Sequence, residues 1–279
     1  MKIRDSLRTS RRVFHEVWDD QLPMAAAGIG FFGMLAVPPA LITLLTVYSL
    51  TADTAHVRDQ LTPLLSALPD PARDLLIRQL QGATELGTRD LTVGLLVSTG
   101  ALLWITSTAM RALIAGLMRA FDQPEDRGFL RVRGLALLFT VGAIVVSAIA
   151  LAAMAVLPIA LDVLGVPEDV RWVVSVVRWG GLVVVLWGAI TVLYRYGPDR
   201  EQARRRWFSW GSLVALLVWM AGSAGFTLYV ESLADYHATY GTLTGLVVLM
   251  LWLYISAFAI LLGAEVDAEM AKSRGTNTS

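Results

Sequence analysis

The chain has 279 residues, of which 56% are apolar and 16% are charged, and its mean hydropathy is +0.60. This composition is too apolar for an ordinary soluble domain of that length and predicts an all-α, polytopic membrane protein. The formal net charge is zero and there is no cysteine. The total charge therefore gives no reason to expect a nucleic-acid partner, and the composition excludes disulfides and thiolate metal sites.

Residues 1–22 combine five basic side chains with apolar residues at helical spacing. Such a pattern predicts a short amphipathic helix lying on the cytoplasmic surface of the membrane. The apolar residues of its expected face are Leu7, Phe14, Val17, Trp18 and Leu22.

Six later stretches are apolar enough, and long enough as helices, to cross the ~30 Å hydrocarbon core of a bilayer. The predicted spans are residues 24–50, 91–110, 135–161, 173–194, 207–230 and 243–262. The second should continue as a helix to Phe121. The first contains Pro38 and Pro39, which remove two backbone donors, so it should kink or break there.

Three glycines of the first span, Gly28, Gly30 and Gly33, have the GxGxxG spacing of dinucleotide sites. No strand precedes them, and the surroundings are those of a membrane helix. We therefore expect close helix packing at these positions instead.

Residues 51–90 form the long hydrophilic connection. Apolar residues recur at helical spacing on both sides of Pro69, and Asp70 followed by Pro71 is typical of a helix start. We expect an extracytoplasmic amphipathic helical hairpin between the first two spans.

The basic residues set the expected orientation. If both termini are inside, 17 of the 23 Lys and Arg residues fall on the cytoplasmic side. The positive-inside rule then predicts cytoplasmic termini for a single six-helix domain over residues 1–279. In this topology residues 263–279 are a charged cytoplasmic tail, beginning where Gly263, Ala264 and Glu265 end the apolar run.

Four segments, taken in chain order, carry a family resemblance. They are MAAAGIGFFGMLAVPPALITLL in the first span, RALIAGLMRAFDQPEDRGFLRVR after the second, LYRYGPDR after the fourth and YHATYGTLTGLVVLMLWLYISAFAILLGAE at the end. Together they resemble the YihY/BrkB family of bacterial inner-membrane proteins. The resemblance implies six helices with both termini inside. One branch of the family is named for a virulence and serum-resistance factor, and other members have been linked to envelope lipid or lipopolysaccharide export. Members have also been labelled ribonuclease BN.

Charged and aromatic side chains near helix ends are the candidate functional residues. Arg111 ends the second span and Glu265 follows the sixth, at about the same membrane depth, so they could form an ion pair or could each simply reach the interface. Basic clusters such as the one containing Arg119 could hold anionic lipid headgroups or only set the topology. The candidate substrate or gating residues are Pro38, Pro39, Arg111, Arg119, Tyr194, Arg195, Tyr240, Gly241 and Glu265.

No catalytic pattern accompanies these residues. The three histidines are far apart, no carboxylates have metal-ligand spacing, and there is no GxSxG or ATP-binding motif. We therefore predict no enzyme, no cofactor and no metal, with membrane lipids as partners. The leading hypothesis is transport of a lipid or other amphiphilic envelope component. The alternatives are a non-transporting scaffold or regulator of envelope assembly and, third, a membrane enzyme.

Overall fold

A computed structural model describes residues 12–13, 15–40, 42–43, 88–124, 126–163, 168–199, 209–232 and 242–275. Over these residues the chain is helical and contains no strand, which confirms the predicted all-α class. The helices are α2 (Leu22–Leu35), α6 (Thr88–Ala120), α7 (Phe129–Val163), α8 (Glu168–Tyr196), α9 (Trp210–Ser232) and α11 (Thr242–Gly275). By length and composition, six helices in the described part of the chain can cross a membrane, the first running from Leu22 to Ala40.

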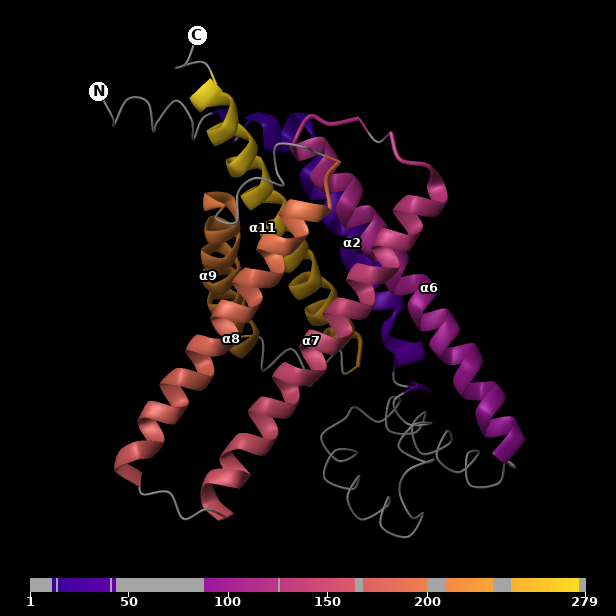
Figure 1. Cartoon of the computed structure of the whole chain (residues 1–279), viewed down its shortest axis with the longest axis vertical. Coiled ribbons are helices and arrows are strands. Elements are labelled where there is room, and N and C mark those ends of the chain that lie inside the picture. Colours follow the sequence, from indigo (N-terminus) through magenta and orange to yellow (C-terminus); the bar gives the residue numbers. More distant parts are fainter. Residues whose placement is uncertain are drawn as a thin grey trace.

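The helices converge at one end of the molecule. Figure 1 shows the first described residues and the C-terminal end of α11 at this converging end, where α6 also ends and α7 begins. There α11 packs against α2 and α9, and α2 packs in turn against α6. Leu22, Leu117 and Leu261 are fully buried, so the core lies where these helices meet. Toward the opposite end, α7 and α8 extend away from the other helices (Figure 1).

Small residues allow the helix axes of the converging end to approach. A Cβ atom on Gly30 would lie 3.2 Å from the backbone nitrogen of Tyr254, and one on Gly33 would lie 3.2 Å from a methyl group of Leu253. Both neighbours belong to α11, which confirms helix packing as the role of these two glycines. Gly28 has nothing within 4 Å and takes no part in that contact.

The first span breaks where the prolines predict. Regular helix α2 ends at Leu35, Ala36 forms a turn, and residues 37–40 are helical again. Neither Pro38 nor Pro39 can donate a backbone hydrogen bond to the preceding turn, which accounts for the interruption. The Pro39 carbonyl accepts a hydrogen bond from the Thr43 hydroxyl at 2.8 Å, and the oxygen of the same hydroxyl lies 3.2 Å from the Ser98 hydroxyl oxygen on α6.

Four of the helices, α6, α7, α8 and α11, are longer than the predicted spans, and the largest difference is at the C-terminus. α11 continues to Gly275, so residues 263–275 are helical where we expected a tail. Gly263, Ala264 and Glu265 do not end the apolar run at the interface, because all three are buried inside the bundle. The residues after Gly263 are mostly good helix formers such as Ala, Glu, Met and Lys, which favours continuation.

The N-terminal segment also differs from the expectation of a helix lying on the membrane surface. Residues 15–19 are helical, but Val13 and Val17 belong to the buried core of the bundle. Trp18, expected on the same apolar face, is instead 60% exposed. The segment therefore packs on the protein itself. Residues 1–11, and the expected hairpin apart from residues 88–90 at the start of α6, lie outside the described residues.

Candidate functional site

Two left-handed residues bring carboxylates together at the converging end. Gln21, with φ 54°, makes the sharp turn between the N-terminal helical segment and α2. The Asp20 backbone N–H donates to the Glu16 carbonyl at 2.8 Å, so these two residues are one helical turn apart. Side chains at positions i and i+4 share a helix face, and both carboxylates therefore point the same way.

The second left-handed residue, Asp122 with φ 51°, closes the end of α6. Its N–H donates to the Arg119 carbonyl at 2.9 Å, and the Gln123 N–H donates to the Met118 carbonyl at 2.9 Å. This is the Schellman pattern, in which the left-handed position is usually Gly or Asn. Aspartate tolerates that conformation better than most residues. The motif ends α6 and places the Asp122 carboxylate beside α11.

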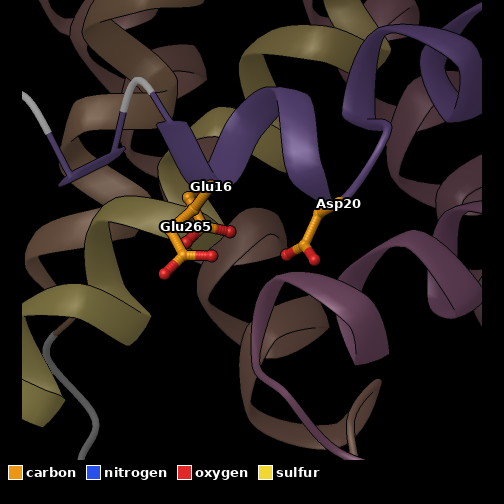
Figure 2. Close-up of side chains that lie close together, drawn as sticks. All are labelled: Glu16, Asp20 and Glu265. Carbon is orange, nitrogen blue, oxygen red and sulfur yellow. The ribbon is translucent and has the colours of Figure 1, made fainter.

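Glu16, Asp20 and Glu265 form what we call the acidic site. Each contributes a carboxylate oxygen, and these oxygens all lie within 4.8 Å of one another. Figure 2 shows Glu265 reaching from α11 toward Glu16 and Asp20 on the N-terminal segment. Glu265 is only 1% exposed, and its Oε2 has no hydrogen-bond partner among the described residues.

Basic side chains at the edge of the acidic site contact other carboxylates. Lys272 Nζ lies 2.7 Å from Asp122 Oδ2 and 4.0 Å from Glu16 Oε1. Arg12 pairs with Glu269 at 3.3 Å, one turn beyond Glu265 on α11. In the described part of the chain, ion pairs therefore link both the N-terminal segment and the end of α6 to α11.

The electrostatics of Asp20 reflect this crowding. Partial burial raises the pKa of its carboxyl above the usual value, and the nearby negative charges of Asp122 and Glu16 raise the pKa further. The positive charges of Lys272 and Arg119 act in the opposite direction but do not cancel the effect.

A second feature is the arginine pair, Arg111 on α6 and Arg133 on α7. Arg133 is 8% exposed, donates to Thr108 Oγ1 and to the Trp104 carbonyl, both at 3.1 Å, and lies 4.0 Å from the Trp104 ring centroid. The Arg111 guanidinium lies 4.8 Å from the ring centroid of Phe129, and its buried Nε has no hydrogen-bond partner among the described residues. Within that part of the chain, neither arginine forms an ion pair with a carboxylate.

The third feature is the apolar half of α7 and α8 that points away from the converging end. Every residue from 141 to 149 of α7 is exposed, so no face of this stretch is covered by the other described residues. On α8, Trp172 and Val177 are 65% and 67% exposed. We call residues 141–149 and 172–185 the apolar arms.

Of the two alternatives for Arg111 and Glu265, the ion pair does not form. Arg111 contacts Phe129, whereas Glu265 points toward Glu16 and Asp20. Glu265 lies within α11, which continues to Gly275, on the face that packs against the N-terminal segment. Its side chain therefore meets Glu16 and Asp20 instead of Arg111.

The other predicted site residues do not gather at one place. Tyr194 is buried, and its hydroxyl donates to the Ile260 carbonyl of α11. Arg119 is exposed and donates to the Ala115 carbonyl at 3.4 Å, and the Arg195 guanidinium lies 5.4 Å from the centroid of the Tyr196 ring. Pro38 and Pro39 lie at the break of the first span. Tyr240 and Gly241 lie outside the described residues.

Sequence reasoning missed Glu16 and Asp20 as partners of Glu265. The four-residue spacing of the two acids was the available signal, but about 245 residues of chain separate them from Glu265. Only the folding of the N-terminal segment back onto α11 brings these carboxylates together.

Comparison with known proteins shows which sequences the chain resembles. The model of the family described as Virulence factor BrkB matches residues 13–279. The ribonuclease-like protein YfkH of Bacillus subtilis is 30% identical over 255 residues, covering 89% of this chain and 90% of that protein. A UPF0761 membrane protein of Xanthomonas oryzae is 28% identical over 279 residues, and the chain spans 64% of that relative's length. No solved structure matches.

Proposed function

The chain belongs to the family described as Virulence factor BrkB, and from that premise we propose that this multi-pass membrane protein transports or exports a lipid or other amphiphilic component of the cell envelope. We further propose that it resides in the bacterial inner membrane with both termini in the cytoplasm. The distribution of Lys and Arg along the sequence supports this orientation.

The arginine pair is the observation that carries the proposal. A charged side chain within a membrane-spanning helix costs about 2.5–3.5 kcal/mol unless it finds a partner or reaches water. Neither Arg111 nor Arg133 has a carboxylate partner in the described part of the chain, and the Arg111 Nε lacks a hydrogen-bond acceptor there. A phosphate or carboxylate headgroup would supply charge and acceptors at once. The ligand that fits this site is therefore an anionic amphiphile.

The apolar arms support the same reading. Lipid acyl chains can cover side chains that the other described residues leave exposed, and residues 141–149 offer such a surface on every side of α7. The arms and the arginine pair share α7, since Arg133 lies on the same helix. A headgroup at the arginine pair could thus have its acyl chains along the arms.

Mass spectrometry of lipids that co-purify with the protein from native membranes tests the proposal. We expect anionic lipids to be enriched several-fold over bulk membrane in the wild type and to fall to bulk level in Arg111→Gln. The control is Arg131→Gln, which removes an exposed arginine from the start of α7, the helix that also carries Arg133. That variant should keep the enrichment. Equal lipid profiles in all three proteins would instead favour a scaffold or regulator of envelope assembly.

An enzymatic role is the third alternative, and the name of the Bacillus relative makes ribonuclease activity the form to test. We expect the purified protein to leave RNA intact in the presence of Mg²⁺. Hydrolysis that is lost in Glu265→Gln but kept in Asp126→Asn would contradict this expectation, because the acidic site would then be catalytic.

A further inference from the structure

We propose that the acidic site binds a hard divalent cation, Mg²⁺ or Ca²⁺, between the N-terminal segment and α11. The proposal does not depend on lipid transport, since it concerns carboxylates of the converging end and neither the arginine pair nor the apolar arms.

The spacing of the oxygens fits one ion. Ca²⁺ takes oxygen ligands at about 2.3–2.6 Å, so two ligands on opposite sides of the ion are at most about 5 Å apart. The oxygens contributed by Glu16, Asp20 and Glu265 are all within 4.8 Å of one another. One ion placed among them could therefore contact all three after small side-chain adjustments.

Glu265 is the independent observation that points to a ligand. Its side chain is almost completely buried, its Oε2 has no hydrogen-bond partner among the described residues, and Figure 2 shows it pointing into the group. A buried polar atom without a partner is unfavourable, and an unpaired buried charge is more so. Glu265 faces the carboxylates of Glu16 and Asp20, which repel its charge. A cation among the three turns this repulsion into attraction.

The described basic groups do not fill this role. Lys272 lies at the rim, where it contacts Asp122 and Glu16, and Arg12 contacts Glu269. No basic side chain in the described ranges forms an ion pair with Glu265.

The chemistry of the donors selects the class of ion. All three ligands are carboxylates, and hard cations such as Mg²⁺ and Ca²⁺ prefer oxygen, whereas Zn²⁺ and Cu²⁺ favour imidazole or thiolate. An entry path from water exists, because the Glu16 side chain is 38% exposed and that of Asp122 is 54% exposed. Water can complete the coordination from this side. The bound ion would clamp the N-terminal segment onto α11.

Binding of Mn²⁺, a spectroscopic substitute for Mg²⁺, provides the test. Purified, delipidated full-length protein in neutral detergent is titrated with Mn²⁺, and free Mn²⁺ is followed by electron paramagnetic resonance. We expect one saturable site per chain that Mg²⁺ or Ca²⁺ displaces. Glu265→Gln, which removes one charge without changing side-chain size, should weaken binding at least ten-fold. Asp126→Asn removes one charge from an exposed position outside the site and should bind as the wild type does.

A stability measurement guards against misfolding of a variant. Addition of Ca²⁺ should raise the Tm of the wild type and of Asp126→Asn but not that of Glu265→Gln or Glu16→Gln. Absence of saturable Mn²⁺ binding to the wild type would overturn the proposal, as would equal binding by Glu265→Gln. Loss of Mn²⁺ binding with unchanged lipid enrichment, or the reverse, would separate this proposal from the proposed function.

Discussion

Glu265 and Tyr194 show how polar side chains are accommodated in this apolar chain. Tyr194 is buried, but its hydroxyl has a hydrogen-bond partner, because it donates to the Ile260 carbonyl of α11. Glu265 is equally buried, yet one of its oxygens lacks a partner among the described residues. The first side chain links α8 to α11, and the second is the residue on which the proposed cation site rests.

Replacing Tyr194 by Phe should cost stability through the lost hydrogen bond alone. The ring would keep its packing, including the edge-on contact with Phe121 at 6.1 Å between ring centroids. A typical buried hydrogen bond contributes about 1 kcal/mol, so the Tm in detergent should fall by roughly 2–4 °C. Tyr196→Phe is the control, since Tyr196 is 42% exposed, and it should leave the Tm unchanged. Equal Tm values for the two variants would show that the bond contributes nothing.

Asp20 should make the stability depend on pH. Its carboxyl has a usual pKa of 3.8, and the folded protein raises that pKa through burial and neighbouring negative charges. Between the two values the folded state holds more protons than the unfolded state. The free energy of unfolding therefore falls as pH rises through this window, and the loss is complete above the folded pKa. The charges that face Asp20 are those of Glu16, Asp122, Glu265, Arg119 and Lys272.

Asp20→Asn should remove this contribution. In chelator, the variant should lose less Tm than the wild type as the pH rises from the usual pKa of 3.8 through the raised pKa of folded Asp20. Asp126→Asn, which alters an exposed carboxyl outside the site, should follow the wild type. Parallel pH profiles for wild type and Asp20→Asn would contradict the assigned electrostatics.

At the scale of elements, close approach of α9 to α11 holds the converging end together. A Cβ atom on Gly263 would lie 2.5 Å from both the Ala215 Cβ and the Gly211 carbonyl oxygen, and 2.7 Å from the Tyr194 hydroxyl. Two of these neighbours are rigid helix atoms that cannot move aside on their own. Small residues at such crossings are how membrane helices gain contact, because lipid competes for larger apolar side chains.

Gly263→Ala should therefore push α9 away from α11. Overpacking of this kind costs about 1–3 kcal/mol, measurable as a lower Tm or as earlier unfolding in denaturing detergent. Gly225→Ala on α9 is the matched control, since nothing lies within 4 Å of its added Cβ. Its effect should be neutral or stabilising by up to about 1 kcal/mol, because alanine favours helix. A Gly263→Ala protein as stable as the control would show that the two helices can separate without cost.

Hydropathy predicts the helices well but not where they end. A run of apolar residues shows that a helix can cross a bilayer, and the proline pair shows where the first span breaks. Gly263 and Ala264 after an apolar run predict the end of a helix, but in the structure Gly263 is the small residue that allows α9 to approach α11. The spacing of residues within α11 alone does not show that its small residues pack against another helix.

At the scale of the whole molecule, we predict from the six candidate spans that the two ends of the described chain lie on one side of the membrane. We predict that this side is the cytoplasm. The chain has no cysteine, so single cysteines report position without background. Asp126→Cys, between α6 and α7, should react with a membrane-impermeant maleimide only after cells are permeabilised. Ser232→Cys, at the end of α9, should react in spheroplasts that are intact. The reverse pattern would invert the topology.

The candidate sites were harder to predict than the helices because the residues of each site lie far apart along the chain. Arg111 could be singled out as a charge at the end of an apolar run, but its neighbour Arg133 could not be placed beside it without the packing of α6 on α7. The acidic site likewise joins residues from opposite ends of the sequence. Local patterns predict which side chains are unusual, and tertiary structure decides which of them meet.

Movement of a labelled lipid across a reconstituted bilayer tests transport most directly. Proteoliposomes containing fluorescent NBD-phosphatidylglycerol are exposed to dithionite, which destroys only the label on the outer leaflet, so that slow further loss of fluorescence reports translocation. We predict a rate well above that of protein-free liposomes, reduced about ten-fold in Arg111→Gln and unchanged in Arg131→Gln. A contact with the moving headgroup that contributes about 1.4 kcal/mol at the barrier changes the rate about ten-fold. A wild-type rate equal to that of protein-free liposomes, repeated with other anionic envelope lipids, would contradict transport and leave a scaffold as the better account.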